Sequence, residues 1–507
     1  MKINTDTRYT SAATVVIFLT YVLALLVLAV FHTIGQDEAQ AWNIAMASQY
    51  PWDVAHHGAK EGHTPLWHGM LWFLTGTTVA FTPFFTAMCA AAVAAMLLKD
   101  RPFHLWVLAL ALAGYFLLYD YSTIPRPYTL ALLFSGILAS YLYRGGSNAV
   151  VLSLLVSSIA FTSSFGILLS VPLACLIFTM LERRKVPTIH SRLFLVAVLF
   201  YFSSVLAAIY FIVFPIDNAY SLHVLSGGGI SKAHWSEAVV SSAFPHYRQL
   251  PFGLGFWLSK TDIGRLIITS AGVVVVASVF ALLYKRQSGV LAWLVAVIVI
   301  SVGCVYSGTG TTRHLGHLFL AAFTILWATG NQPEPAYGAN KNGNSNFHLS
   351  VLPSLILVTV LSYHAAVGLA GSVLSVKKQQ TVGKTIAEYI QKTKSTPYQL
   401  ITNNIHDIGH LVSYLNNIRV YDSVCGCWKE YADMSVSRDW EPENLFNQWC
   451  GLYKSQSIEY ALITTKNELP FDSRFEIEKT FSRGRRDNSD GDFQLWRISA
   501  QGERMCD

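Results

Sequence analysis

The chain has 507 residues, of which 52% are apolar and 13% are charged. Soluble domains carry about 25% charged residues, so the composition excludes an ordinary soluble protein and predicts a polytopic α-helical membrane protein. The net charge of +6 is modest, and the basic residues gather at the ends of apolar runs. That pattern reflects membrane topology and gives no reason to expect nucleic-acid binding.

The first apolar run, Ala12–Ile34, is long enough to cross a bilayer. It is too long for the apolar region of a signal peptide and lacks a small-residue cleavage site, so we expect a retained signal anchor with Lys2 and Arg8 in the cytoplasm. Further apolar runs follow, and their basic flanks fix their orientation. The eleven predicted spans are 12–34, 83–98, 104–119, 128–143, 148–163, 165–181, 193–214, 264–284, 289–306, 315–329 and 350–374.

The predicted first outer loop, 35–82, contains the apolar but short segment Pro65–Thr78. Counting this segment as a span would place Lys99 and Arg101 outside the membrane, against the rule for basic residues. We therefore expect a helix that lies along the membrane surface.

Two adjacent acids, Asp37 and Glu38, directly follow the first span. Acids favour the first turn of a helix, which would explain the pair without any chemistry. The same loop, however, also contains His63, Trp67 and His68. A carboxylate at this position reaches a substrate held at the membrane surface, so we expect one acid to be a catalytic base and the other three side chains to bind substrate.

Arg126 belongs to a second motif, Tyr119-Asp-Tyr-Ser-Thr-Ile-Pro-Arg-Pro-Tyr128, at the outer end of the third span. Pro125 and Pro127 bracket it and hold the local backbone extended. A planar guanidinium matches phosphate oxygens, whereas an arginine without that role would extend toward lipid head groups. Composition leaves both readings open, and Arg126 and Tyr128 are candidates for substrate binding.

A third motif, Thr311-Thr-Arg-His-Leu-Gly-His317, enters the tenth span from outside and adds Arg313 and His314 to the candidates for substrate binding. His314 and His317 are three residues apart and share one helix face, as a pair of metal ligands would. Hydrogen-bonded interfacial histidines are favoured, because no third ligand stands nearby. No cofactor is certain, and a divalent metal is left open.

The composition becomes polar after Leu374, beyond a Gly/Asn-rich linker at 331–346. We divide the chain into a membrane domain, 1–374, and a small extracytoplasmic α/β domain of about 130 residues, 375–507. Strand-like runs alternate there with helical runs (strands Tyr398–Thr402, Ile418–Tyr421, Tyr460–Thr464 and Phe493–Ile498; helices Val382–Thr393 and His406–Asn416).

The C-terminal domain also contains four cysteines, Cys425, Cys427, Cys450 and Cys506. In an oxidising compartment, four cysteines in one small domain predict two disulfides. A zinc site is the alternative, but Cys-x-Cys is poor spacing for zinc.

Four features together resemble the GT-C fold glycosyltransferases, a group that includes the protein O-mannosyltransferases and the bacterial transferase that puts aminoarabinose on lipid A. The first is the acid after the first span (Asp37-Glu38-Ala39), and the second is the segment His63-Thr64-Pro65-Leu66-Trp67, which looks like the family's His-Pro-Pro-Leu motif. The third is the stretch Tyr121-Ser122…Arg126-Pro127-Tyr128, similar to the family's Tyr-Ser-x-x-x-Arg-Pro stretch. The fourth is the polytopic body with its α/β tail. The resemblance covers 1–330 well and the tail in outline. The chain departs from the pattern at Thr64, which replaces the first proline, and at Tyr128, where many relatives have an acid, so the resemblance does not imply a metal-bridging second acid here.

The resemblance implies that Asp37 is the general base that deprotonates the acceptor, with Glu38 as the alternative. The donor would be a sugar on a polyprenyl phosphate, with the leaving phosphate near Arg126, and the acceptor a glycan, lipid or protein of the cell envelope. The site and the tail would face the periplasm from a bacterial inner membrane. A single displacement inverts the anomeric carbon, and inversion is the expectation because no nucleophilic second acid can be identified.

The main alternative is a lipid or solute transporter or flippase, which would use charges and broken helices at the bilayer midplane. Here the charges and histidines gather at the outer ends of the spans, and no inverted repeat is visible. A sensor or scaffold protein that acts through its tail is the third reading. An outer groove leading to Asp37 would favour the transferase, and a central two-sided cavity would favour transport.

Overall fold

The long apolar runs of the chain form helices, because a helix satisfies its own backbone hydrogen bonds in hydrocarbon. The computed structural model describes residues 7–59, 64–186, 192–213, 262–307, 312–331, 348–377 and 382–393. In the tail it describes 398–402, 411–415, 420–422, 427–429, 448, 450, 452, 459–465, 475–481 and 493–498. Each range predicted as a span contains a helix.

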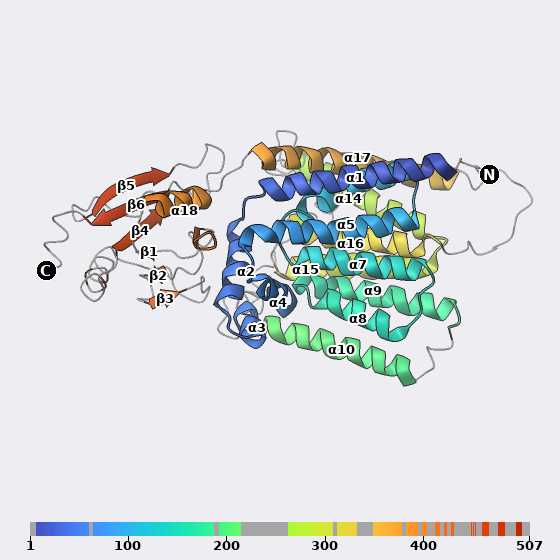
Figure 1. Ribbon diagram of the computed structural model, residues 1–507. Coiled ribbons are helices and arrows are strands. Elements are labelled where there is room, and N and C mark those ends of the chain that lie inside the picture. Colours follow the sequence, from blue (N-terminus) through green and yellow to red (C-terminus); the bar gives the residue numbers. More distant parts are fainter. Residues whose placement is uncertain are drawn as a thin grey trace, which may run out of the picture.

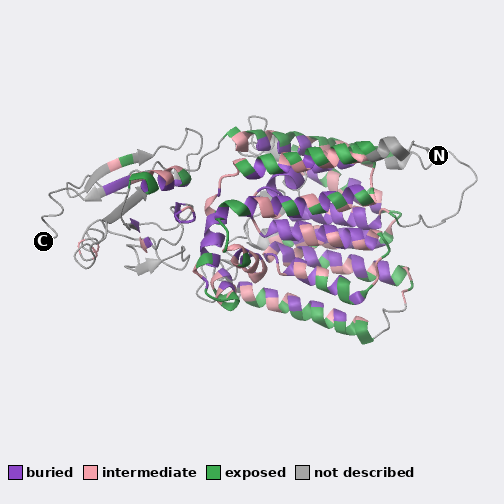
Figure 2. Ribbon diagram, viewed as in Figure 1, coloured by how far each residue is buried: buried purple, intermediate pink, exposed green. Residues whose placement is uncertain are grey.

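The helices of the membrane domain pack side by side, α1 against α5, α5 against α7, α7 against α16 and α9 against α15 (Figure 1). In Figure 2 the outward faces of α1 and α10 are exposed, and they carry large apolar side chains such as Leu19, Leu23 and Leu199, as surfaces against lipid do. The bounds are α1 Thr7–Phe31, α5 Thr82–Asp100, α6 Leu105–Leu112, η2 Tyr115–Asp120, α7 Tyr128–Tyr143, α8 Ala149–Ala160, α9 Ser164–Arg183, α10 Arg192–Val213, α14 Asp262–Leu283, α15 Gln287–Ser307, α16 Thr312–Thr329 and α17 His348–Lys377.

Length and apolar composition make the chain an integral membrane protein, but they do not establish eleven spans. Within the described residues, five helices are long and apolar enough to cross a membrane: Ala12–Phe31, Val79–Asp100, Ser164–Arg183, Arg192–Ile212 and Val351–Lys377. Other apolar helices are shorter, namely Tyr128–Tyr143, Ala149–Ala160, Thr269–Leu283, Gln287–Gly303 and Gly316–Thr329. The total of eleven stays a prediction.

The predicted span 104–119 is not one continuous α-helix. The helix α6 ends at Leu112, and after Gly114 the chain continues as the π-helix η2. The helix α17 crosses at this break, where a Cβ on Gly368 would lie 2.5 Å from the carbonyl oxygen of Ala113. Only glycine allows such an approach of two backbones. Short π-helices are frequent at functional sites, and η2 ends at Asp120, inside the second motif.

The first outer loop folds into three short helices, α2 (Gln36–Ala47), α3 (Pro51–Ala59) and α4 (Pro65–Leu74), and the 3-10 turn η1 (Val79–Phe81). The helix α4 begins at Pro65, since proline suits the first position of a helix. Thr64 precedes it, and its hydroxyl donates to the carbonyl of Phe161, directly after α8. Figure 1 shows α2, α3 and α4 at the end of the bundle nearest the sheet. The position of α4 along a membrane surface stays a prediction.

The described residues of the tail form a six-stranded sheet in the order β3-β2-β1-β4-β6-β5, together with helix α18 (Val382–Thr393). The strand β1 is parallel to β2 and β4, and the other pairs are antiparallel. Ile386 and Ile390 of α18 pack on Leu400, Val420 and Leu495 of the sheet. The strands are β1 Tyr398–Thr402, β2 Val420–Asp422, β3 Cys427–Lys429, β4 Glu459–Thr465, β5 Phe475–Phe481 and β6 Phe493–Ile498.

The tail contacts the membrane domain beside the first outer loop. The backbone N–H of Ile34 donates a hydrogen bond of 3.2 Å to the hydroxyl of Tyr414, and the Tyr414 ring packs on the apolar cluster of Ile34, Trp42 and Trp67. The helix α17 continues to Lys377, just past the predicted domain boundary. The extracytoplasmic location of the tail stays a prediction.

The cysteines differ between the two parts of the chain. Cys89 and Cys175, in apolar helices, are free. Cys450 in the tail is disulfide-bonded. Cys425 and Cys506 lie outside the described residues, and of Cys427 the structure describes the backbone in β3 alone. The pairing among these cysteines stays a prediction.

Candidate functional site

The first turn of α2 separates the two adjacent acids. Glu38 stands at the third position of the helix and its Oε2 accepts a hydrogen bond of 3.1 Å from the backbone N–H of Gly35, which caps the helix. The same oxygen lies 2.7 Å from Nε2 of His32. The Glu38 side chain is buried, so this carboxylate is occupied by the fold of the loop.

Asp37 is the more exposed of the two acids and pairs with a different residue. Its side chain is 53% exposed, and its Oδ2 lies 2.8 Å from a terminal nitrogen of Arg126. The first turn of a helix stabilises a carboxylate there through the backbone dipoles. The structure thus brings together the first and second sequence motifs through Asp37 and Arg126.

Arg126 lies in the short segment between η2 and α7, where the backbone is held on both sides. The backbone N–H of Thr129 donates to the Arg126 carbonyl at 3.1 Å, and the Thr129 hydroxyl donates to the Tyr121 carbonyl at 2.7 Å. The Arg126 side chain is 17% exposed. Burial alone would lower the pKa of Arg126, but the carboxylates of Asp37 and Glu38 outweigh burial and hold that pKa above its ordinary value.

A third acid, Asp120, belongs to the same group and was missed from the sequence. It is 4% exposed at the end of η2. Burial raises the pKa of Asp120 to about 7; the positive charge of Arg126 opposes that rise, and the negative charge of Glu38 adds to it. The available signal was its position: like Asp37, it follows directly on an apolar run.

Aromatic rings connect the second motif to the third. Tyr128, buried at the start of α7, meets the rings of His314 and His317 edge-on at 5.8 and 5.2 Å. His314 also stacks on Phe165 at 4.6 Å. The Nδ1–H of His317 donates to the His314 carbonyl at 3.0 Å, which fits the hydrogen-bonded reading of this pair. Across the described residues, no three His, Cys, Asp or Glu side chains form a metal-binding group.

The remaining candidates are buried in α4 or only partly described. Trp67 and His68 are buried in α4, 1% and 0% exposed, with Trp67 in an apolar cluster. His63 lies outside the described residues, and of Arg313 the structure describes the backbone but not the side chain. Their contribution to substrate binding stays a prediction.

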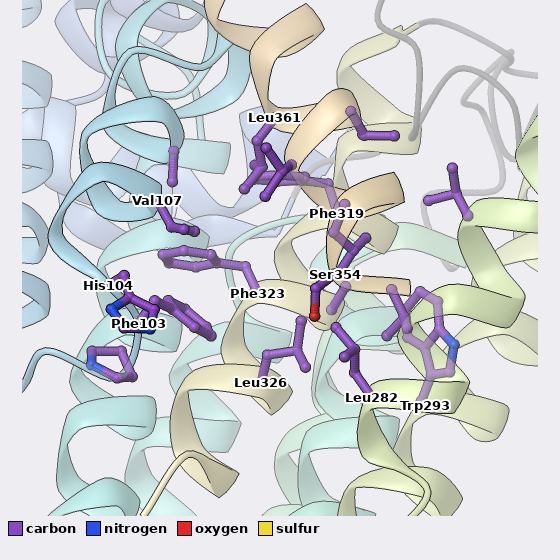
Figure 3. A pocket seen from close by; sticks show the side chains of 18 of the residues that line it. Phe103, His104, Val107, Leu282, Trp293, Phe319, Phe323, Leu326, Ser354 and Leu361 are labelled. Atoms are coloured by element: carbon purple, nitrogen blue, oxygen red, sulfur yellow. The ribbon is translucent and has the colours of Figure 1, made fainter. Parts of the chain in front are cut away.

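A cavity of about 580 Å³ lies between α6, α14, α15, α16 and α17. Figure 3 shows Phe103, Phe319, Phe323, Trp293 and Leu361 around it. Its wall is apolar apart from a few side chains, among them His104 and Ser354. Asp37, Asp120 and Arg126 do not line it, so the cavity and the charged group are separate features of the bundle.

No family model matches the chain, and no curated protein matches it. Among solved structures, the chain is similar to ArnT from Cupriavidus metallidurans, in a crystal structure bound to undecaprenyl phosphate. The TM-score is 0.45 and the identity 11%, over 96% of this chain and 98% of that one. The chain is also similar to the arabinofuranosyltransferase AftD from Mycobacteria, seen by cryo-electron microscopy, with a TM-score of 0.34 and 13% identity over 98% of this chain and 40% of that one. At these TM-scores and identities neither similarity assigns a role to this chain, and the chemistry has to be read from the residues of the site.

Proposed function

We propose that the chain is a membrane glycosyltransferase that moves a sugar from a polyprenyl-phosphate donor to an acceptor of the cell envelope. The observation that carries the proposal is the pair of Asp37 and Arg126, 2.8 Å apart, in which the carboxylate is half exposed and the guanidinium mostly buried. A transferase of this kind needs a base for the acceptor and a cation for the leaving phosphate, and the pair supplies both.

The reaction assigns one role to each partner. The acceptor hydroxyl loses its proton to Asp37 while its oxygen forms a bond with the anomeric carbon of the sugar. The bond from that carbon to the phosphate oxygen breaks, and the polyprenyl phosphate leaves with the electron pair. Arg126 stabilises the charge that builds on the phosphate, and its planar fork suits that group. One displacement of this kind inverts the anomeric carbon.

The position of the pair suits a lipid-linked donor. Asp37 and Arg126 lie at one end of the helical bundle, beside the short helices of the first outer loop. A polyprenyl phosphate keeps its chain in the hydrocarbon and its phosphate at the interface, so its head group meets the protein at such an end. The tail contacts the same end through Tyr414, where we place the acceptor side, in the periplasm of a bacterial inner membrane.

The test is sugar transfer by the purified protein in liposomes. A panel of polyprenyl-phosphate sugars is offered with cell-envelope extract as acceptor, and the product is followed by mass spectrometry and its anomeric configuration by NMR. We expect transfer with inversion by the wild type. Asp37→Asn should lower the rate by about a hundredfold to ten-thousandfold, the usual contribution of a general base.

The adjacent acid provides the matched control. Glu38→Gln keeps a side chain that accepts from the N–H of Gly35, so the helix start should persist and the rate should stay within about a factor of five of the wild type. Adding EDTA tests the divalent metal that the sequence left open. Transfer by Asp37→Asn at the wild-type rate rejects the base, and flux of a lipid or solute across the liposome without sugar transfer would support a transporter instead.

A further inference from the structure

Two buried polar atoms of the site are unsatisfied. Oδ2 of Asp120 and Nε of Arg126 are both buried, and neither has a hydrogen-bond partner among the described residues. The positive charge of Arg126 acts on the Asp120 carboxyl and lowers its pKa, against the effect of burial. An unpaired buried carboxyl oxygen and an unpaired buried N–H are each costly, so the state in which a ligand satisfies both is favoured.

We propose that Asp120 is a second phosphate-binding residue, which donates a hydrogen bond from its protonated carboxyl to the donor phosphate that Arg126 holds. This inference rests on the proposed function and extends it to the recognition of the phosphodiester. A phosphate oxygen only accepts hydrogen bonds. It accepts from the N–H of Arg126 in any state, but from Asp120 only while that carboxyl carries its proton.

The charges around Arg126 also require that Asp120 is protonated when the phosphate is bound. Within the described residues, Asp37 and Glu38 already face this guanidinium. A third carboxylate beside a phosphodiester would add repulsion that the one guanidinium does not offset. Burial raises the pKa of Asp120 to about 7, so at neutral pH much of the protein carries a neutral Asp120.

Donor binding should therefore be linked to a proton. A bound phosphodiester raises the pKa of Asp120 further, because it adds a negative charge and accepts from the protonated form. The bound protein then holds a proton that the free protein releases as the pH rises through about 7. The dissociation constant should rise with pH over that range.

Other titratable groups surround the site and have to be separated from Asp120. Histidines also favour anions when protonated, so a pH profile of the wild type alone does not identify the group. The titratable groups on the elements packed against η2 and around Arg126 are Tyr21 on α1, His32 before α2, Asp37 and Glu38 on α2, Tyr128 on α7, His314 and His317 on α16, and Tyr363 and His364 on α17.

The experiment measures binding of methyl decaprenyl phosphate to the full chain in detergent. This probe is a phosphodiester without a sugar, so it does not titrate near neutral pH and is not turned over. Tryptophan fluorescence gives the dissociation constant from about pH 6 to about pH 9. We expect the dissociation constant of the wild type to rise about tenfold over this range. Asp120→Asn should keep the low-pH affinity at every pH, whereas Asp53→Asn, on α3 of the first outer loop, should keep the wild-type slope.

Calorimetry in two buffers of different ionisation enthalpy gives a second readout. It uses the wild type alone, so it does not depend on whether Asp120→Asn folds. We expect proton uptake on binding at about pH 7.5. A flat wild-type profile, a slope that persists in Asp120→Asn, or binding without proton uptake overturns the role of Asp120 while leaving the transferase in place. No binding of the probe at any pH, together with no sugar transfer, overturns both.

Discussion

Two arginine–aspartate pairs lie in different parts of the bundle, and their environments are opposite. In one, Arg126 is 17% exposed and Asp37 is 53% exposed at a separation of 2.8 Å. In the other, Arg144 is 44% exposed and Asp100 is 3% exposed at 2.7 Å. The second oxygen of Asp100 accepts from the indole N–H of Trp327 at 3.1 Å, so both of its oxygens are used.

The comparison shows that the ion pair alone does not indicate function. Asp100 is saturated, and its pair joins the ends of α5, α7 and α16. Asp37 keeps an accessible carboxylate while its cation is buried, which is the arrangement that a base and an anion-binding group require. Breaking each pair should therefore have different consequences.

The largest effect is expected on the rate of transfer. Arg126→Lys keeps the charge but loses the planar fork, and losing a charge-assisted hydrogen bond costs about 1.5–3 kcal/mol. We expect about a ten- to hundredfold loss of rate, with weaker donor binding. Arg144→Lys, the same change in the other pair, should leave the rate of the folded protein unchanged. Equal losses in both variants would show that the two pairs do not differ as proposed.

For the free energy of unfolding, we expect the larger loss when the second pair, Arg144 and Asp100, is broken. Asp100→Asn leaves Arg144 or Trp327 without an acceptor, which should lower the free energy of unfolding by about 1–3 kcal/mol. Asp37→Asn keeps an amide oxygen that can accept from Arg126 and leaves the charge of Glu38 beside it, so its loss of stability should be smaller than that of Asp100→Asn. Thermal unfolding in detergent measures both. A larger loss in Asp37→Asn than in Asp100→Asn contradicts the structural role of the second pair.

Asp120 allows a test that depends on pH. Burial raises the pKa of its carboxyl in the folded protein to about 7, above the ordinary value of about 3.9. Between about pH 4 and about pH 7 the folded state holds a proton that the unfolded state has released, so stability should fall as the pH rises through that window. Asp120→Asn should remove this loss. Its unfolding temperature should therefore exceed that of the wild type by more at about pH 8 than at about pH 5. A constant difference between the two proteins would mean that Asp120 does not titrate there.

The sequence was most informative where hydrophobic length decides the structure. The apolar runs predicted the helices, and Pro65 predicted the start of α4, because both signals are local. The break between α6 and η2 was missed, since it depends on the distant Gly368 of α17. The strands β1 and β6 occupy the predicted ranges Tyr398–Thr402 and Phe493–Ile498.

The site shows the same limit. The sequence does not distinguish the adjacent acids Asp37 and Glu38. In the structure, contacts with Gly35 and His32 hold Glu38 at the start of α2. Asp120 is an acid after an apolar run, as Asp37 is, but its burial and its coupling to Arg126 arise only when η2, α2 and α7 come together. Residue type identified Asp37, Glu38 and Arg126 as candidates, and burial in the structure distinguishes the three acids from one another.

The smallest expected effect concerns Tyr414, which connects the tail to the end of the bundle that contains Asp37. Its hydroxyl accepts from the backbone N–H of Ile34 at 3.2 Å, directly before the turn into α2. Tyr414→Phe keeps the ring in the apolar cluster and removes one neutral hydrogen bond, worth about 0.5–1.5 kcal/mol. Hydrogen exchange at the Ile34 amide should accelerate by a factor of about two to ten, because local opening governs it. The rate of transfer should change by less than about a factor of three, since Glu38 and His32 still hold the start of α2. If the Ile34 amide keeps its protection in Tyr414→Phe, the hydrogen bond from the tail does not stabilise this loop. The position of Asp37 would then depend on contacts within the helical bundle alone.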